Sequence, residues 1–216
     1  MSSTWQSAPA PATGYSYGSL PQKATGVPGF MCPSDPTNPK LNSKDGPASG
    51  NNQGFHGNYL LSAGSQTYGT TSAGTAQLNG LSFPLSAVKT KDVTDGLSKT
   101  VAVSEIMLVP EPVGSVDDTR GRYHNNMHGG CNFSTFHTPN TTVNDRLPYC
   151  SNARSLAPCV GGSGANHVIA ARSYHAGGVN AAMADGAVRF VTNEISVQIW
   201  QAVGSRSGGE IGNVPE

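Results

Sequence analysis

An Asp-Gly pair at residues 185–186, set between two short apolar runs, is the feature that most limits how this chain can fold. Before the pair, Val179, Ala181 and Met183 alternate with polar or small residues, and after it Val188 and Phe190 are again two positions apart. A type I′ turn needs positive φ at both central residues, and Asp-Gly is among the pairs that adopt it most readily. The sequence therefore predicts a β-hairpin that turns at Asp185-Gly186.

A short helix is predicted directly after this hairpin, over residues 194–202. Ile195, Ile199, Trp200 and Val203 fall at helical spacing, and residues 207–209 (SGG) end the pattern. We expect this helix to lie across the inner face of the hairpin, so that Val188, Phe190, Ile199 and Trp200 share one apolar cluster. Residues 172–210 would then form the structural centre of the chain.

Composition favours a loop-rich β protein. The chain has 216 residues with 27 Gly and 15 Pro, only 12% of its residues are charged, and its formal net charge is zero. We expect an extended lead-in over 1–29 and a single globular domain over 30–216, mainly β (α+β). Its core would be a twisted, mostly antiparallel sheet with long loops and one or two short helices. Further strands are predicted at 59–61, 78–83 and 100–108, the last with a bulge near Ser104.

The absence of a basic excess argues against nucleic acid as a partner. No run of about 18 apolar residues occurs, so the sequence predicts no membrane span.

Five segments in a fixed order resemble the bacterial family of the domain of unknown function 1559. They are FMCPSDP at 30–36, NYLLSAG at 58–64, DVTDGLSKT at 92–100 followed by Ser104-Glu105, His175 with nine residues before Asp185-Gly186, and RSGGE at 206–210. The fourth is similar to the prepilin-type H-x9-DG motif of that family.

The resemblance implies a pilin-like surface protein whose full-length relatives are membrane-anchored or assembled through a long N-terminal helix. Because the sequence begins just upstream of residues 30–36, we expect only the globular head here, outside the cell or at its surface. The implied function is non-enzymatic binding of glycans, polysaccharides or other small solutes. The alternative is a hydrolase, a glycoside hydrolase or an esterase, so whether the chain is an enzyme stays open.

Four cysteines are present, and in an exported chain an even number favours disulfides. Cys150 and Cys159 enclose an eight-residue loop, so we predict that they are bonded to each other. Cys32 and Cys131 would form the remaining pair, and free buried thiols are the alternative. No CxxC-type pair is present to indicate a zinc site.

Three residues are candidates for catalysis if the protein is an enzyme: Glu105, His175 and Asp185. Glu105 lies in an apolar strand and needs a partner there, for which Arg172 or Arg189 is expected. His175 is expected to bond to the backbone where the chain enters the hairpin. A direct pair with Asp185 is not expected, because the intervening strand would hold the two about 30 Å apart if fully extended.

Oxygen-bearing side chains between residues 92 and 98 could hold a calcium ion, with Asp92 and Asp95 as the candidate ligands. The alternative is that these carboxylates cap turns. His124, His128 and His137 are candidates for a transition-metal site, although loop histidines on the surface are more common. If an ion is bound, the sequence favours calcium held by oxygen atoms.

Overall fold

The computed structural model describes residues 25–41, 54–69, 78–111, 117–123 and 129–209. The predicted lead-in at 1–29 therefore lies almost entirely outside the described residues. The strands are β1 (Tyr59–Ser62), β2 (Val101–Glu105), β3 (Asn132–Phe133), β4 (Asp145–Leu147), β5 (Cys159–Gly161), β6 (Gly178–Met183) and β7 (Val188–Thr192). One α-helix, α1 (Val197–Gly204), and three short 3₁₀-helices, η3 (Pro28–Phe30), η4 (Thr90–Asp92) and η5 (Leu97–Lys99), complete the described elements.

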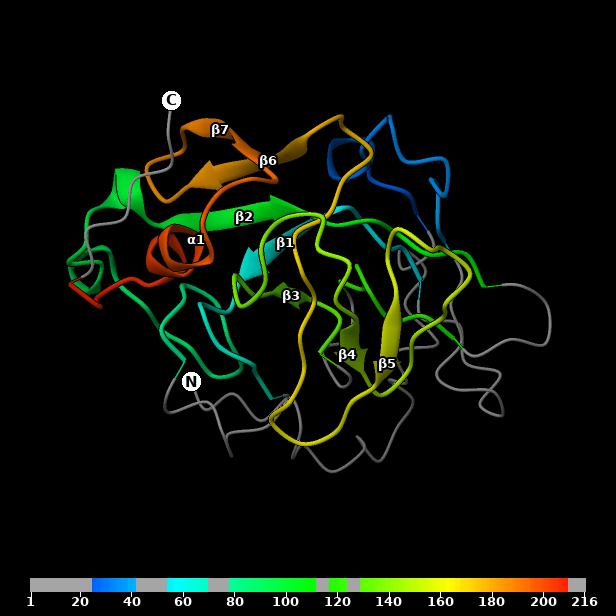
Figure 1. The fold of residues 1–216 in the computed structure, drawn as a ribbon, viewed down its shortest axis with the longest axis horizontal. Coiled ribbons are helices and arrows are strands. Elements are labelled where there is room, and N and C mark those ends of the chain that lie inside the picture. Colours follow the sequence, from blue (N-terminus) through cyan, green and yellow to red (C-terminus); the bar gives the residue numbers. More distant parts are fainter. Residues whose placement is uncertain (1–24, 42–53, 70–77, 112–116, 124–128, 210–216) are drawn as a thin grey trace.

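A five-stranded sheet in the order β3-β1-β2-β6-β7 dominates the fold (Figure 1). All its neighbouring strands are antiparallel except β1 and β3, which are parallel. A separate parallel pair, β4 and β5, lies beside it. The predicted mainly β fold with a mostly antiparallel sheet is confirmed. The bulge of β2 lies between Val101 and Val103, earlier in the strand than predicted.

The loop of the β6–β7 hairpin contains one residue more than predicted. Gly186 N donates to Met183 O, and Met183 N donates to Ala187 O. Gly186 has a φ of 91°, whereas Asp185 is not among the described non-glycine residues with positive φ. This pattern belongs to a three-residue loop in which a type I turn is followed by a left-handed glycine. The position of the turn was predicted correctly, but the type I′ assignment was wrong.

This additional loop residue decides which face of β7 points into the core. Val188 pairs with Ala182, whereas a two-residue loop would have paired it with Met183, which is buried. Because side chains alternate across a strand, a shift of one residue turns all of them to the opposite face. Val191 is consequently buried, while Val188 is 68% and Phe190 45% exposed. The prediction that Val188 and Phe190 join the apolar cluster of the helix was wrong.

Helix α1 covers the inner face of the sheet, and its first turn is capped by a serine. The Ser196 hydroxyl accepts a hydrogen bond from Ile199 N, which satisfies one of the free amides at the helix start. Trp200 and Val203 are fully buried, and the Trp200 ring stacks on Phe133 of β3 with ring centroids 6.4 Å apart. The predicted helix is thus present, although it begins later than residue 194.

The main core joins α1 to the inner face of the large sheet. Its buried members are Leu60, Val101, Ile106, Leu108, Phe133, Leu147, Ile169, Ala171, Val179, Ala181, Met183, Val191, Ile195, Trp200 and Val203. The strand predicted at 78–83 is absent from the described structure. The backbone there is held by other groups, because the Arg206 guanidinium donates to the carbonyls of Leu78 and Gly80. The amides of Leu81 and Ser82 both donate to the single carbonyl of Ser62, so the backbone contacts here are irregular and do not form a strand ladder.

Candidate functional site

The outer face of the large sheet is apolar and open. Strand register places Leu61, Val103, Ala182 and Val188 in one row across β1, β2, β6 and β7. Beside this row lies a groove of about 260 Å³, lined by Gly29, Phe30, Tyr59, Val103, Asn180, Ala181, Ala182 and Val188. Because α1 covers the opposite face, these side chains meet solvent, and Leu61 and Phe30 are about half exposed.

A buried carboxylate lies on the same face as the groove. Glu105, the last residue of β2, pairs with Tyr59 across the β1–β2 ladder and is only 2% exposed. Its Oε2 accepts a hydrogen bond from Asn180 N at 2.7 Å, and its Oε1 lies 3.1 Å from His175 Nε2 and accepts from Asn180 Nδ2 at 3.2 Å. The buried acid is therefore satisfied by β6 and by the loop that enters it.

The Cys32 thiol completes this cluster. Its Sγ lies 3.8 Å from the same His175 Nε2, and donor atoms of Cys32, Glu105 and His175 all fall within 4.8 Å of one another. Cys32 is 4% exposed, whereas the His175 side chain is 32% exposed. The cluster thus has two buried members and one that reaches solvent.

The CPSDP turn at residues 32–36 is fixed to the sheet by Asn58. Asn58 Oδ1 accepts from Cys32 N at 2.9 Å, while its amide donates to Asp35 Oδ2 at 2.7 Å and to Ile106 O at 3.0 Å. Asp35 Oδ2 also accepts from Leu108 N. Asn58 lies just before β1, and Ile106 and Leu108 lie just after β2. Their contacts with the turn hold Cys32 over the outer face, next to Glu105.

Tyr59 contributes a phenol to the same surroundings. Burial raises the pKa of the Tyr59 hydroxyl, and the nearby Cys32 and Glu105 raise it further because a phenolate would be repelled there. Tyr59 therefore stays protonated at neutral pH and can donate a hydrogen bond. Since it also lines the groove, Tyr59 joins the groove to the cluster.

The cluster does not have the arrangement of a nucleophile–histidine–acid triad. In such a triad the base receives the proton at one ring nitrogen and is oriented through the other. Here Cys32 Sγ and Glu105 Oε1 both approach Nε2 of His175. Glu105 therefore competes with the thiol for that nitrogen instead of orienting the ring for it. Three different donor atoms converging on one point is the geometry of a ligand set.

Of the three residues predicted as catalytic candidates, the structure brings two together. The prediction that Glu105 is paired is confirmed, but the partner is His175 with Asn180 and not an arginine. The Arg172 guanidinium pairs with Asp145 instead. The backbone interpretation of the His175 ring was likewise wrong, because its Nε2 faces a carboxylate.

Asp185 is not part of the cluster, because β6 separates it from His175. Its Oδ1 accepts from Ala187 N within its own turn at 2.9 Å. From the sequence, Cys32 was expected to be a disulfide partner or a free buried thiol, and its position beside His175 was not predicted. Cys32 and His175 are 143 positions apart in the sequence. The only feature that could have linked them is that both lie on the outer side of the sheet.

The cysteine predictions are half correct. Cys150 and Cys159 form a disulfide with Cα atoms 6.2 Å apart, which confirms the predicted pair. Cys32 and Cys131 are free thiols, so their predicted pairing was wrong. Cys32 is held against His175, whereas the Cys131 thiol donates to Arg122 O at 2.6 Å. Burial raises the pKa of Cys131 to about 12.

The predicted calcium ligands are used for protein hydrogen bonds. Asp95 accepts from the backbone amides of Gly208 and Gly209 through its two carboxylate oxygens, and Asp92 accepts from Lys89 N. These contacts are those of turn-capping residues, and calcium binding at Asp92 and Asp95 stays a prediction.

Of the histidines considered for a transition metal, His124 and His128 lie outside the described residues. His137 packs edge-on against Phe136. Burial, followed by the charge of Arg146, lowers its pKa.

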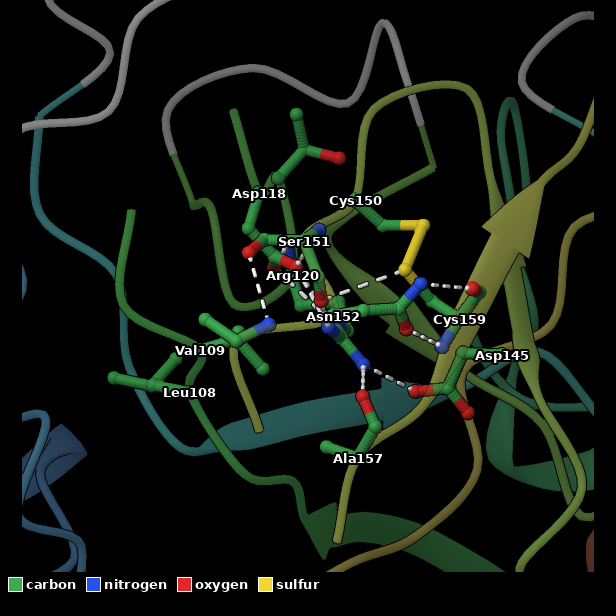
Figure 2. Close-up of polar contacts among 12 residues, drawn as sticks. Leu108, Val109, Asp118, Arg120, Asp145, Cys150, Ser151, Asn152, Ala157 and Cys159 are labelled. Carbon is green, nitrogen blue, oxygen red and sulfur yellow. Dashed lines mark hydrogen bonds and ion pairs between the residues drawn. A yellow bond between two sulfur atoms is a disulfide. The ribbon is translucent and has the colours of Figure 1, made fainter. Parts of the chain in front are cut away.

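A second polar cluster is fully enclosed and joins β4 to neighbouring loops (Figure 2). Arg120 pairs with Asp118 at 2.6 Å and with Asp145 at 2.8 Å. Arg172 also pairs with Asp145, at 3.0 Å. Each of these side chains is at most 1% exposed. Burial alone would raise the pKa of Asp118, but the charges of Arg120 and Lys40 and the hydrogen bonds to the carboxylate together outweigh it, so the pKa lies below its usual value. This cluster cannot meet a ligand, so its role is structural.

Comparisons with known proteins identify the family. A family model described as "Protein of unknown function (DUF1559)", with the short name SBP_bac_10, matches residues 1–198 of the 216. No curated protein and no solved structure matches the chain. Among the described residues, no helix has the length and apolar character needed to cross a bilayer. Because the match extends over most of the sequence, the chain belongs to the DUF1559 family.

Proposed function

We propose that this protein is an extracellular or cell-surface binding module that receives the ring of a sugar, or of a similar small solute, on the outer face of its sheet. The observation that carries the proposal is the groove of about 260 Å³ on an otherwise open apolar sheet face. The resemblance of the five sequence segments to the DUF1559 family, whose model matches residues 1–198, also implies binding of a solute.

The lining of the groove has the composition of a binding site. Such sites are mostly apolar with a few polar groups that fix orientation. Here the apolar part comes from Phe30, Val103 and Val188, while the Tyr59 phenol and the Asn180 side chain supply the polar groups. A sugar ring has an apolar C–H face and hydroxyl groups around its edge, so it would find both kinds of partner.

The size of the groove limits the ligand. Pockets for drug-sized ligands have volumes of about 300–1,000 Å³, and this groove is slightly smaller. It would therefore hold one ring, with any remaining part of an oligosaccharide extending over the exposed row of Leu61 and Val188.

Binding should be tested by calorimetric titration with a panel of monosaccharides and short oligosaccharides, including glucose, galactose and N-acetylglucosamine. Val188→Lys places a charge at the groove and should abolish binding. Val160→Lys is the matched control, because Val160 is also an exposed strand valine but lies on β5, away from the groove. The proposal would be contradicted if no sugar gave a heat of binding, or if the two variants bound the same sugar equally well.

A hydrolase is the second candidate, and the observation in its favour is the thiol of Cys32 at 3.8 Å from His175. Such a pair could attack an ester carbonyl, with the thiol proton passing to the imidazole and then to the departing alcohol; water would hydrolyse the resulting thioester and release the acid and the free thiol. Polysaccharide hydrolysis fits less well, because a glycosidase needs two carboxylates facing one bond and Asp185 lies beyond β6. Steady cleavage of 4-nitrophenyl acetate that is lost in Cys32→Ser would establish the esterase, and no cleavage above buffer would eliminate it.

A further inference from the structure

We propose that Cys32, Glu105 and His175 form a binding site for a divalent transition metal of the zinc class. This inference does not depend on sugar binding in the groove, because it concerns only the cluster at the end of β2. It also differs from the calcium prediction, which places an ion on oxygen atoms at residues 92–98.

The donor set selects the metal. A thiolate, an imidazole and a carboxylate are all established ligands of Zn²⁺, and a site with three protein ligands leaves a fourth position for water or substrate. Calcium and magnesium prefer oxygen donors alone. Since sulfur and nitrogen provide two of the three donors here, the site favours zinc or a neighbouring transition metal.

The distances agree with a tetrahedral ion. Zn–S bonds of about 2.3 Å and Zn–N or Zn–O bonds of about 2.0–2.2 Å place two ligand atoms about 3.3–3.6 Å apart. The structure has 3.1 Å between His175 Nε2 and Glu105 Oε1, and 3.8 Å between His175 Nε2 and Cys32 Sγ. The third separation, between the Cys32 and Glu105 donor atoms, is within 4.8 Å, so an ion would draw these two donors together by up to about 1 Å.

The ligands are held in place by the backbone around them. Asn180 N fixes Glu105 Oε2, which leaves Oε1 directed at His175. Cys32 is fixed through its backbone amide to Asn58, and the backbone amide of His175 donates to Ser173 Oγ. Groups that orient ligands in this way are typical of metal sites.

Charge compensation gives an independent argument. Glu105 is 2% exposed. Its described side-chain hydrogen bonds come from the Asn180 amides, which are neutral, and from the His175 ring, which balances the carboxylate charge only when the ring is protonated. A buried carboxylate is costly unless its charge is balanced. A divalent cation between Glu105 and Cys32 would balance it and would also stabilise the thiolate.

Solvent reaches the site from the side of His175, whose side chain is 32% exposed. A metal ion could therefore enter without unfolding, and a water molecule or a group of a bound ligand could take the fourth position. Tyr59, whose phenol lies near Cys32 and Glu105, would be able to donate a hydrogen bond to that fourth ligand.

The test uses the chelator-treated full chain with Co²⁺ as a spectroscopic probe. We expect one equivalent of cobalt to bind and to produce a sulfur-to-cobalt charge-transfer band in the near ultraviolet, together with the intense visible bands of tetrahedral cobalt. Zn²⁺ should remove both signals by displacement. A wild-type protein that binds no cobalt, or whose spectrum lacks the sulfur band, would overturn the proposal.

Variants locate the site. Cys32→Ser should lose the sulfur band. Glu105→Gln and His175→Asn should weaken cobalt binding by more than about 100-fold, because loss of a group that only orients a ligand weakens metal binding by about 10–100-fold. Cys131→Ser is the matched control, because it removes the other free thiol and should leave the spectrum unchanged. A sulfur band that survives in Cys32→Ser, or disappears in Cys131→Ser, would refute the assignment.

A thermal melt distinguishes loss of metal binding from loss of stability in the variants. Zn²⁺ binds only the native site, so it should raise the melting temperature of the wild type and of Cys131→Ser. It should not raise that of Cys32→Ser, even if this variant is less stable without metal. Equal stabilisation of Cys32→Ser and the wild type would show that zinc binds elsewhere.

Discussion

Replacement of Arg120 by methionine tests how much the enclosed charge network stabilises the fold. Methionine has a similar length but no charge, so Asp118 and Asp145 would lose the guanidinium that lies 2.6 and 2.8 Å away. The main-chain carbonyls of Ser151 and Ala157 would also lose a donor. Figure 2 shows these partners arranged around one side chain.

The expected loss follows from these contacts. Removing one partner of a buried ion pair costs about 3–5 kcal/mol, and each orphaned carbonyl adds about 1–3 kcal/mol. Burial of the methionine side chain returns about 1.5–3 kcal/mol. With two carbonyls affected, these ranges give a fall in the free energy of unfolding of about 2–9 kcal/mol at pH 7. A typical domain is stable by about 5–15 kcal/mol, so the loss is a large part of the total.

The loss should depend on pH. In the wild type, the lowered pKa of Asp118 stabilises the fold above the unfolded pKa of about 3.9, and this contribution disappears as pH falls through the folded pKa. In Arg120→Met, the larger of the two cationic charges that oppose the effect of burial is lost and Lys40 remains. The pKa of Asp118 is therefore higher than in the wild type, and the carboxyl group is protonated at a higher pH. The difference between the two proteins should therefore be smaller at pH 4 than at pH 7.

Urea unfolding of both proteins at pH 7 and pH 4 measures these differences. Arg154→Met is the matched control, since Arg154 is only partly buried and its described contacts are a hydrogen bond to Thr37 and the ring of Tyr174. It should cost about 1–2 kcal/mol at either pH. A loss below about 1.5 kcal/mol for Arg120→Met at pH 7, or an equal loss at both pH values, would refute the reasoning.

Four further predictions concern stability, the disulfide and ion binding. Trp200→Ala should lower the free energy of unfolding by about 3–5 kcal/mol because Trp200 is fully buried, and a loss below about 1 kcal/mol in a urea melt would contradict this. Asp185→Asn should change it by less than about 0.5 kcal/mol, since an asparagine oxygen can accept the same turn hydrogen bond, and a larger loss in the same melt would show another role for the carboxylate. Peptide mapping without reductant should recover Cys150 and Cys159 as one linked species, and reduction should cost about 2–3 kcal/mol through loop entropy; alkylatable thiols at both positions would contradict the pairing. If Asp95 holds calcium, a calcium-selective chelator should lower the melting temperature of the wild type but not of Asp95→Asn, and no change in either would remove that prediction.

The sequence by itself determined the features that depend on neighbouring residues. Alternation in residues 179–183 predicted β6, the helical spacing of Trp200 and Val203 predicted α1, and the short separation of Cys150 and Cys159 predicted their disulfide. Each depends on backbone periodicity or on the reach of a short loop, which are visible within about ten residues. The order of the five resembling segments likewise indicated the family that the comparison over residues 1–198 established.

Only the tertiary structure decided which side chains meet. One residue more in the hairpin loop turned Phe190 outward, and no local pattern distinguishes that loop from a two-residue turn. The need of Glu105 for a partner could be predicted from its apolar strand, but its choice of His175 over Arg172 could not. That choice depends on the side of β2 to which Glu105 points and on the turn at 32–36 that the Asn58 hydrogen bonds hold above it. Residues 143 positions apart, such as Cys32 and His175, are brought together by the packing of the whole sheet, because contacts between distant segments depend on chain topology and not on local preference.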